Sequence, residues 1–359
     1  MYVQQVSLTD FRNYTAQTVS FSDGLNVIEG LNTAGKTNLV ESVCLCGVGK
    51  SPRGAKDREL IRFGADSAHV TLTVQKKYRT HRIDVHLTAK GKSIAIDGVS
   101  IGKMADLMGV LNVVYFSPDE LKIVKEDPSE RRRFLNIGLC QQNKAYFSAL
   151  SNYNRIVEQR NALLKEARSL DELQATLPVW NAQLAEEGAK IILARQDFMT
   201  HLCALADPIH RTIAGEHCDL TLSYTAYPCD TYRPLCDHLL QRLSEVTAKE
   251  WNTRYTLVGP HRDDFSIVSE GKDLRTYGSQ GQQRTAALAL KLAEIAYLEQ
   301  NTDEKPVLLL DDVLSELDAK RREALLKATR GVQTLLTCTE FGEPEEYVTR
   351  RIHVVSGHC

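Results

Sequence analysis

The chain has 359 residues, of which 43% are apolar and 25% charged, and its formal net charge at pH 7 is -2. Such a composition is ordinary for a globular protein with a sizeable core, and it excludes binding to nucleic acid through the overall charge, so any DNA contact must come from a local patch. No apolar run approaches membrane-spanning length and the first residues lack a signal-peptide pattern, which predicts a cytoplasmic protein without membrane contact.

The nine cysteines mostly stand singly inside apolar stretches, a pattern that predicts reduced core thiols rather than disulfides. Cys218, Cys229, Cys236 and His238 form a loose group that lacks the close paired spacing of a zinc site. A zinc site is therefore the less favoured interpretation.

The first candidate site is a phosphate-binding loop, GLNTAGKT, between a predicted strand and a predicted helix. Residues 2–8 alternate like a strand, and a second alternating run leads to a short buried strand over residues 25–28. From Asn38 onward the apolar residues recur with helical spacing. A glycine, four free positions and Gly-Lys-Thr in this context predict backbone N-H groups around phosphate oxygens, with Lys36 at the β- and γ-phosphates and Thr37 on Mg²⁺. The predicted nucleotide-binding residues are Gly30, Leu31, Asn32, Thr33, Ala34, Gly35, Lys36, Thr37 and Asn38.

Two basic segments follow the loop helix. The first is a Gly- and Pro-containing stretch over residues 50–62, which predicts an exposed loop that either binds anions or is simply solvated. From residue 69 to residue 98 the apolar residues recur with a period of two, which predicts an antiparallel subdomain with one wet face. Its first hairpin carries four basic residues that either rest on a DNA backbone or face solvent. They are Lys76, Lys77, Arg79 and Arg82.

The middle of the chain predicts an inserted, mainly helical lobe over residues 117–258. A short apolar strand over 113–116 is followed by Ser-Pro-Asp-Glu, a capping box that begins a helix. Residues 128 to about 213 are strongly helical, with Pro178 separating two halves, and the pattern is too short for a long coiled-coil arm. Residues 219–227 and 255–258 are predicted strands that return the chain to the first domain.

A second candidate site begins at Ser279, in the run TYGSQGQQR. Ser279 and Gln282 form a capping box at the start of a helix, and Gly281 permits close approach to the backbone. A helix N-terminus of this kind is suited to an anion.

A third candidate site follows four apolar residues, 307–310, which predict a parallel strand buried on both faces. Asp311 and Asp312 stand at its carboxyl end, where α/β sheets place their ligands. We predict that Asp311 holds Mg²⁺ and that Asp312 orients or deprotonates the water that attacks the γ-phosphate. SELD, from Ser315 to Asp318, then leads into a helix from residue 319 to about 329.

Together, the phosphate loop, SQGQQR, LLLDD and SELD resemble the ABC-type ATPase heads of the SMC family of DNA-maintenance proteins. FRNY near the start, FSPDEL, RRRFL, GPHRDD and the lack of a long coiled coil are similar to a short bacterial recombination member of that family. The resemblance spans essentially the whole chain.

The resemblance implies an α/β fold: an ABC-type head over residues 1–116 and 259–359, with mixed and antiparallel sheets around the phosphate-loop core, plus the helical lobe. It also implies that two heads enclose two ATP molecules, each phosphate loop facing the signature of the other copy. Further residues take their roles from it: Arg12 and Asn13 near the nucleotide, Ser279, Gln280, Gly281 and Gln282 as the signature acting in trans, Ser315 and Asp318 in the D-loop, and Asp119 or Glu120 near the Q-loop.

In function, the resemblance implies a weak, DNA-stimulated ATPase that needs Mg²⁺ and forms an ATP-dependent homodimer on duplex DNA and at junctions of single and double strands. It implies help for RecO and RecR in loading RecA at single-strand gaps, followed by replication-fork repair and SOS induction. No base-recognition motif is visible, so the sequence does not indicate a preference for a DNA structure.

Three positions depart from the family pattern. Thr33 and Ala34 stand where many relatives carry Gly and Ser, which should alter contacts without abolishing binding. Asp312 replaces the Glu of transporter ATPases, so we predict slow turnover. The switch position, a His in transporters, is Thr337 or Thr339. For His261 the sequence gives only a motif match.

Two other functions share parts of these motifs. A transporter ATPase subunit carries the same ATP motifs, but its inserted lobe is normally much shorter than the one predicted here. An interaction scaffold without essential hydrolysis is the other alternative, and it predicts that Asp312→Asn leaves function in cells unchanged.

Overall fold

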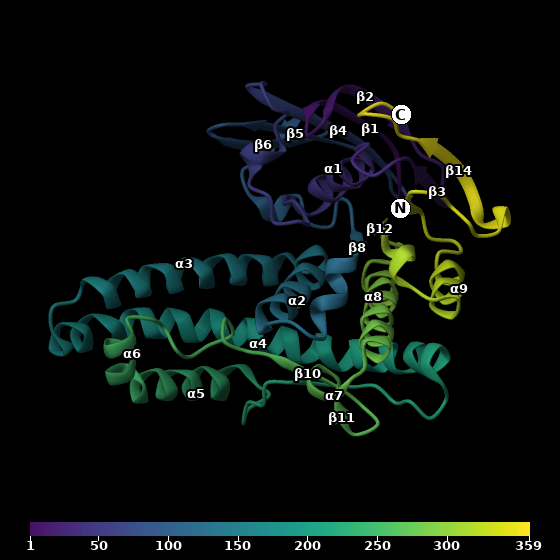
Figure 1. Ribbon diagram of the computed structural model, residues 1–359. Helices are drawn as coiled ribbons and strands as arrows, with labels where there is room; N and C mark the ends of the chain where they lie inside the picture. Colours follow the sequence, from purple (N-terminus) through teal and green to yellow (C-terminus); the bar gives the residue numbers. More distant parts are fainter.

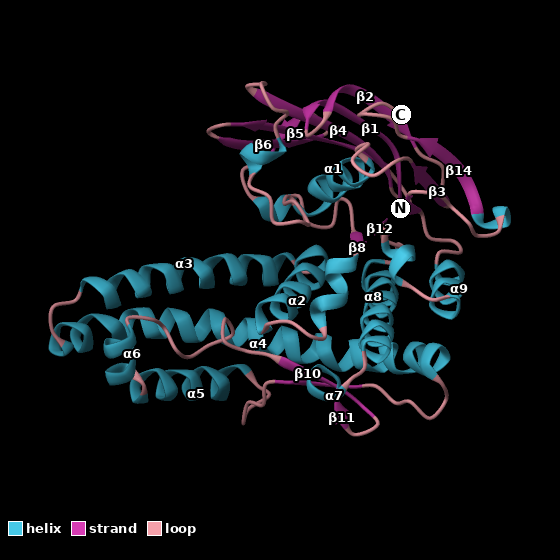
Figure 2. Cartoon of the chain, in the orientation of Figure 1, coloured by secondary structure: helices cyan, strands magenta, loops and turns pink.

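The computed structural model describes the backbone of residues 1–359 and the side chains of all residues except 120–122. The molecule has two layers (Figure 1), an upper head that contains both chain ends and a lower helical lobe. Strands gather in the head, whereas helices make up most of the lobe (Figure 2). This α/β architecture confirms the predicted fold class.

The outer sheet of the head is antiparallel and six-stranded. Alternate residues of its strands are buried, as in the strand over Ser67–Gln75, so one face packs on the core and the other meets solvent. The antiparallel subdomain predicted over residues 69–98 is confirmed within this sheet. Its strands are β1 (Tyr2–Phe11), β2 (Tyr14–Ser20), β4 (Ser67–Gln75), β5 (Thr80–Thr88), β6 (Gly91–Ile96) and β7 (Val99–Ser100), in the spatial order β2-β1-β4-β5-β6-β7.

The inner sheet of the head is parallel and five-stranded. Its central strands are buried at every residue, which explains their continuous apolar sequences. The strands predicted before the phosphate loop, over residues 113–116 and over residues 307–310 are all confirmed. In spatial order they are β14 (Val348–His353), β3 (Leu25–Glu29), β13 (Thr334–Cys338), β12 (Val307–Asp311) and β8 (Val113–Phe116).

Helix α1 (Lys36–Val48) packs between the two sheets, while α8 (Gln280–Thr302) and α9 (Ala319–Ala328) cover the other face of the parallel sheet. The side chains of β12 pack alternately toward α1 and toward α8, because successive side chains of a strand point to opposite faces. Leu309 packs in the cluster of α1, whereas Leu308 and Leu310 pack in the cluster of α8. The phosphate-loop helix and the signature helix therefore share one strand as their support.

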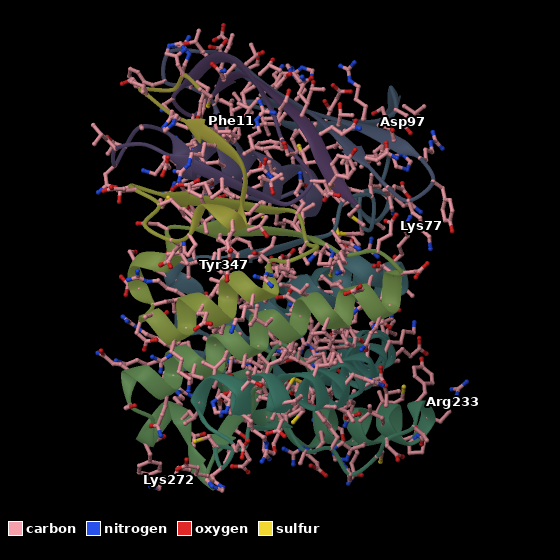
Figure 3. All side chains as sticks on the ribbon, turned by 90° about the vertical axis from the view of Figure 1, so that its right-hand side faces the viewer. Phe11, Lys77, Asp97, Arg233, Lys272 and Tyr347 are labelled. Carbon is pink, nitrogen blue, oxygen red and sulfur yellow. The ribbon has the colours of Figure 1, made fainter. Side chains whose placement is uncertain are left out.

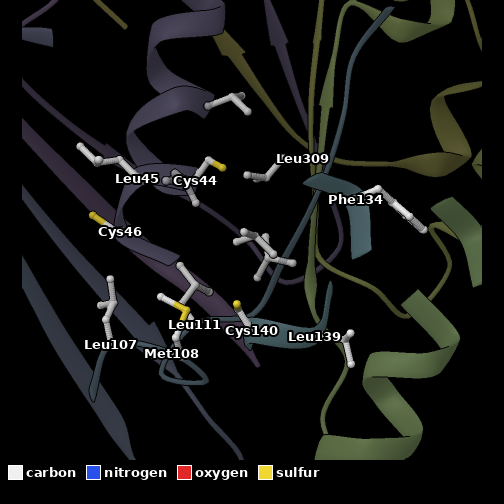
Figure 4. Close-up of a cluster of buried hydrophobic side chains, with 14 of the residues drawn as sticks. Cys44, Leu45, Cys46, Leu107, Met108, Leu111, Phe134, Leu139, Cys140 and Leu309 are labelled. Carbon is white, nitrogen blue, oxygen red and sulfur yellow. The ribbon is translucent and has the colours of Figure 1, made fainter. Parts of the chain in front are cut away.

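The cysteines near α1 belong to this core. Cys44, Cys46 and Cys140 lie among leucine and methionine side chains (Figure 4), and all three are buried. All nine cysteines are free thiols, as predicted. Burial raises the pKa of the Cys140 thiol to about 12, which keeps that thiol protonated and unreactive near neutral pH.

The helical lobe is built on the 45-residue helix α4. Pro178 lies inside α4 and does not divide the helical region, so that prediction is wrong. Leu177 and Asn181 on either side are buried by neighbouring helices, and this packing outweighs the backbone hydrogen bond that proline cannot make. The helices are α2 (Pro128–Gln142), α3 (Lys144–Glu166), α4 (Leu170–Ala214), α5 (Tyr232–Glu245), α6 (Thr247–Thr253) and α7 (Leu274–Tyr277).

A small antiparallel sheet completes the lobe: β9 (Thr221–Tyr224), β10 (Phe265–Ser269) and β11 (Lys272–Asp273). The strand predicted over residues 255–258 is absent from the structure, because side chains bind its backbone instead: Asn161 Oδ1 accepts from Thr256 N, and Glu250 Oε1 accepts from Leu257 N. Since β10 pairs with β9, residues 265–273 lie with the lobe, although the predicted division assigned them to the head.

Five short 3-10 helices link these elements, and the helix expected at Pro118 is one of them. The capping box there rests on Glu120, whose side chain lies outside the described residues. No helix in the described part of the chain is long and apolar enough to span a membrane. The 3-10 helices are η1 (Asp57–Leu60), η2 (Met104–Asp106), η3 (Pro118–Ile123), η4 (Val313–Glu316) and η5 (Glu345–Tyr347).

Candidate nucleotide site and signature helix

The phosphate loop leaves the carboxyl end of β3 and enters α1, as its sequence predicts. Both of its glycines are required by the structure. A Cβ atom at Gly30 would lie 2.3 Å from the Val354 carbonyl oxygen. Gly35 has a φ of 117°, and a Cβ there would lie 2.6 Å from the Asn13 side chain. The backbone of the loop therefore curls so tightly that a side chain at Gly30 or Gly35 would clash with its neighbours.

Lys36 lies at the centre of this curl. Its ammonium donates to the Gly30 carbonyl at 2.6 Å and to the Leu31 carbonyl at 2.9 Å, and the residue is 7% exposed. The cation is thus held at the mouth of the loop, where it can meet a phosphate group. Leu31, Asn32 and Thr33 are exposed, with Thr33 at a φ of 72°, whereas Ala34 is buried.

The outer side of the loop is held by side chains from FRNY. Asn13 Nδ2 donates to the Ala34 carbonyl at 3.0 Å, and Asn38 Nδ2 donates to Asn13 Oδ1 at 2.8 Å. The Tyr14 hydroxyl donates to the Gly35 carbonyl at 3.0 Å, a contact that sequence reasoning missed. Asn13 therefore contacts the phosphate loop, and its place near a nucleotide stays a prediction.

Arg12, which is predicted to lie near the nucleotide, is bound to a carboxylate of the phosphate-loop helix. Its guanidinium forms a bidentate pair with Glu41, at 2.8 and 2.9 Å, and donates to the Glu59 carbonyl at 2.9 Å. Because Glu41 is fully buried in α1, Arg12 fixes the phosphate-loop helix against η1. In the described contacts it supports the site through α1 and does not touch the loop itself.

Asp311 joins the phosphate loop to the parallel sheet. Its Oδ1 accepts from the Thr37 and Thr337 hydroxyls, each at 2.8 Å, and its Oδ2 accepts from the Tyr115 hydroxyl at 2.9 Å. The structure thus brings the two predicted Mg²⁺ ligands, Thr37 and Asp311, into direct contact. Tyr115 and Thr337 are positioning residues for that carboxylate, and motif reasoning did not find Tyr115.

Asp312 has a different environment from its neighbour. Its backbone is left-handed, with φ 53°, and its N-H donates to the Thr337 hydroxyl at 2.9 Å. Burial and the charge of Asp311 raise the pKa of the Asp312 carboxyl, and the charge of Lys36 opposes them. A carboxylate with a raised pKa beside the lysine of the phosphate loop is suited to accept a proton.

The two candidates for the switch residue are now distinct. Thr337 is fully buried, and its hydroxyl donates to Asp311 Oδ1 and accepts from Asp312 N. Thr339 is exposed and follows the end of β13, whose last residue, Cys338, pairs with Glu29 just before the phosphate loop. Of the two, Thr339 is the one whose side chain is free to meet a ligand.

The signature residues begin α8, and the predicted capping box is confirmed. Ser279 N donates to Gln282 Oε1 at 2.9 Å, and Gln282 N donates to Ser279 Oγ at 3.2 Å. Ser279, Gln280 and Gln282 are exposed, and Gly281 is partly exposed. None of the described hydrogen bonds or ion pairs joins these residues to the phosphate loop of the same chain.

Two arginines bind the signature helix to the D-loop. Arg284 donates to the backbone carbonyl and to the carboxylate of Glu316, both at 2.6 Å. Arg321 donates to the Gly281 carbonyl at 2.7 Å and to Thr285 Oγ1 at 2.8 Å, and it pairs with Asp318. Ser315 Oγ donates to the Asp312 carbonyl at 2.7 Å, so the D-loop also touches the catalytic candidate. Sequence reasoning missed both arginines.

The GPHRDD segment has a structural role in the lobe. The Tyr153 hydroxyl donates to His261 Nδ1 at 2.6 Å, and His261 Nε2 donates to the Thr256 carbonyl at 3.1 Å. Burial lowers the pKa of His261 to about 4, so the ring is neutral near pH 7. Arg131 forms a bidentate pair with Asp264, at 2.6 and 3.0 Å. These contacts fasten the returning chain to α2 and α3.

The basic hairpin proposed for DNA is neutralised by carboxylates. Lys77 and Asp97 lie along the same edge of the molecule (Figure 3). Each of the four basic side chains has an acidic partner, so the hairpin is not a free cationic patch. The pairs are Lys76–Glu304 at 3.5 Å, Lys77–Asp303 at 2.6 Å, Arg79–Asp97 at 2.7 Å and Arg82–Asp84 at 2.9 Å.

Asp119, one of the Q-loop candidates, is exposed, and the side chain of Glu120 is outside the described residues.

Fold and site together define an ATPase head of the SMC type. The model of the RecF/RecN/SMC N-terminal domain matches residues 2–342. The chain is 44% identical to a DNA replication and repair protein RecF from Agathobacter rectalis, over 99% of this chain and 98% of that protein. It is 43% identical to the RecF of Lachnoclostridium phytofermentans, over 98% and 96%.

Solved structures agree with these matches. A RecF-ATP structure from the RecFOR pathway superposes with a TM-score of 0.92 at 34% identity, covering 99% of this chain and 96% of that chain. An Smc head domain from Pyrococcus furiosus superposes at 0.54 with 15% identity, which shows the shared fold alone. The chain belongs to the RecF family of DNA replication and repair proteins. Because these matches are to RecF proteins, they give no support to the alternative of a transporter ATPase subunit.

Proposed function

We propose that this chain is an ATP-dependent DNA-binding protein of recombinational repair, in which ATP closes a dimer on DNA and slow hydrolysis releases it. The observation that carries the proposal is the separation of two half-sites on one chain. The phosphate loop, Thr37 and Asp311 lie together, while the signature at Ser279 is exposed and makes no described contact with them. Two copies facing each other would supply each loop with the signature of the other.

The residues present fit ATP with Mg²⁺. Thr37 Oγ1 and Asp311 Oδ1 are oxygen donors 2.8 Å apart at the start of α1, and Mg²⁺ prefers oxygen ligands. When bound, the ion supplies positive charge that neutralises the β- and γ-phosphates. Lys36 is held in the loop by two backbone carbonyls and would turn to the phosphates, and the α1 N-terminus offers N-H groups to the same oxygens.

Hydrolysis would depend on Asp312. Its raised pKa suits acceptance of a proton from the attacking water, and its side chain is one carbon shorter than the usual Glu, which is consistent with slow turnover. Thr339 is proposed as the side chain that senses the γ-phosphate.

The D-loop contacts support communication between the two sites of a dimer. Asp312 touches Ser315, and Glu316 and Asp318 are bound by arginines that also hold the signature helix. A change at one γ-phosphate could therefore reach the signature that serves the other nucleotide.

DNA would bind through local cations, because the whole molecule is slightly acidic. Lys76, Lys77, Arg79 and Arg82 would have to exchange their carboxylate partners for phosphates. Arg53, in the loop after α1, is exposed and has no carboxylate within ion-pair distance among the described residues, so it joins the proposed surface. Family membership supports duplex DNA and strand junctions as ligands, RecR with RecO as partners, and roles in RecA loading, fork repair and SOS induction.

Binding to a fluorescein-labelled duplex, measured by anisotropy with and without ATP and Mg²⁺, tests the proposal. Asp312→Asn should bind the duplex much more tightly with ATP, and Lys36→Ala should show no ATP effect. DNA affinity that is the same with and without ATP in Asp312→Asn would contradict it and favour an interaction scaffold. The scaffold further predicts that Asp312→Asn supports repair in cells as well as the unmodified protein does.

A further inference from the structure

A cavity of about 510 Å³ lies where the head meets the helical lobe (Figure 1). The head contributes the end of α1 and the loop after it, the lobe contributes α2 and α3, and α8 contributes Lys291 and Glu294. Apart from Tyr115, whose hydroxyl binds Asp311, none of its lining residues belongs to the nucleotide site described above. The volume is within the usual range for pockets that bind small molecules.

The lining of the cavity is largely apolar and includes two phenylalanine rings. Phe134 is buried and Phe147 is half-buried. Cys44, Met108 and Cys140 add sulfur atoms to the lining, and these three residues are labelled with Phe134 in Figure 4. Rings and sulfur atoms pack well against an aromatic ring, whereas water finds few hydrogen-bond partners on such walls. The lining therefore favours an aromatic body as the occupant.

The charges that line the cavity do not balance. Among the described lining residues there are four cations and two carboxylates, and each carboxylate is paired with a cation of its own helix. The pairs are Arg133–Glu130 at 3.3 Å and Lys291–Glu294 at 2.8 Å. The other two cations, Lys50 and Arg132, have no carboxylate within ion-pair distance in the described part of the chain. An anionic group would therefore be attracted to this end of the cavity.

Arg132 and Lys50 are placed to receive that group. Arg132 Nη1 donates to the Asp263 carbonyl at 2.9 Å. Burial and the charge of Arg195 lower the pKa of Arg132, so an anion beside its guanidinium would be favoured. Lys50 is exposed at the mouth of the cavity, and its charge acts on the buried Cys140 thiol. A carboxylate suits these cations, because the planar guanidinium matches its two oxygens.

We propose that the cavity binds a small aromatic carboxylate, with its ring among Phe134, Ile137 and Phe147 and its carboxylate at Lys50 and Arg132. The cavity has walls from α1, α2, α3 and α8, so a compact free molecule fits it better than an extended chain. The occupant would contact head and lobe together. This site is additional to the proposed nucleotide and DNA sites and does not depend on them.

Equilibrium dialysis of the purified full chain tests the proposal with 2-naphthoate and its neutral isostere, 2-naphthamide. The chain should retain one 2-naphthoate molecule at saturation and bind it about tenfold more tightly than 2-naphthamide, because only 2-naphthoate carries a charge. Lys50→Ala and Arg132→Met should each weaken 2-naphthoate binding about tenfold and leave 2-naphthamide binding unchanged. Phe147→Ala should weaken the binding of both probes. Lys103→Ala, an exposed lysine of the head outside the cavity, is the matched control.

Two further comparisons separate this site from the nucleotide site and from misfolding. Lys36→Ala should bind 2-naphthoate as the unmodified chain does, so failure of ATP binding leaves this test intact. Lys50 is exposed, so its loss should not alter the melting temperature, which is also measured for Arg132→Met. Equal affinity for the two probes, or 2-naphthoate binding that survives both Lys50→Ala and Arg132→Met, would overturn the proposal. Loss of 2-naphthoate binding in Lys36→Ala would overturn it as well, because the probe would then lie in the phosphate loop.

Discussion

Asp311 and Asp312 are adjacent carboxylates with opposite surroundings. Three hydroxyl groups, from Thr37, Tyr115 and Thr337, donate to Asp311 and hold it in one orientation. Asp312 receives no such donor from the described side chains, and its pKa is raised by burial and by the charge of Asp311. One carboxylate is therefore held in one orientation, as the proposed Mg²⁺ ligand requires, and the other remains available for the proposed proton transfer.

The raised pKa of Asp312 makes a prediction about stability. An acid whose pKa is raised in the folded state costs stability when it is ionised, at pH values above its unfolded pKa. Asp312→Asn should therefore melt at a higher temperature than the unmodified protein at pH 7.5, and the difference should shrink as the pH falls toward 4. Scanning calorimetry at both pH values measures it, with exposed Asp66→Asn as control. A lower melting temperature for Asp312→Asn at pH 7.5 would contradict the assigned environment.

Lys36 makes the second prediction at this scale. Lys36→Ala removes a charged donor that would contact two phosphates, and charge-assisted hydrogen bonds of this kind are worth roughly 1.5–3 kcal/mol each. We expect ATP affinity to fall about 100-fold or more, measured by equilibrium titration with a fluorescent ATP analogue. Lys50→Ala, an exposed lysine after α1, should bind ATP normally. If Lys36→Ala bound ATP with unaltered affinity, the loop would not be part of the nucleotide-binding site.

At the scale of elements, α8 and α9 form one unit with the D-loop. Arg284 and Arg321 connect the first turn of α8 to residues 316 and 318, which follow Asp311 and Asp312 closely in sequence. Because α8 also shares β12 with the phosphate-loop helix, the signature is supported by the strand that carries Asp311. The signature helix is thus positioned by the phosphate-loop region of its own chain, while in the proposed dimer it would serve the nucleotide of the other chain.

Arg321→Ala tests this unit. Loss of the guanidinium frees the Gly281 carbonyl and Thr285, so the signature should be less well positioned. We predict an ATP-dependent dimer weakened about tenfold and unchanged ATP affinity of the monomer, measured by analytical ultracentrifugation and by titration. Lys320→Ala, its exposed neighbour, should dimerise normally. Dimerisation equal to that of the unmodified chain would show that the Arg321 contacts are not needed to position the signature.

The sequence predicted those parts of the fold whose evidence is local. Four apolar residues before two aspartates identify β12, and Ser279 with Gln282 identifies the start of α8, because each pattern is complete within a few residues. Contacts between distant residues could not be predicted this way. Tyr115 and Asp311 are 196 positions apart, and Gly281 and Arg321 are 40 apart. Pro178 does not divide the helical region, because the helices that pack around α4 outweigh its local propensity to end a helix.

At the scale of the whole molecule, one chain carries two half-sites, and a closed dimer is the arrangement that would complete both. Ser279→Arg places a long cation where the partner's nucleotide would lie. We predict that it leaves ATP affinity of the monomer within about twofold and abolishes the ATP-dependent dimer. Titration and sedimentation velocity measure the two quantities. If ATP affinity is lost together with dimerisation, the signature acts within its own chain.

The most direct test of the account is the molecular mass of Asp312→Asn by light scattering, with and without ATP and Mg²⁺, repeated with duplex DNA. We predict about 40 kDa, the mass of one 40.2 kDa chain, without nucleotide and twice that mass with ATP, with the dimer persisting on DNA. A particle that keeps the mass of one chain in every condition would contradict the ATP-closed dimer and direct the search toward a different partner chain.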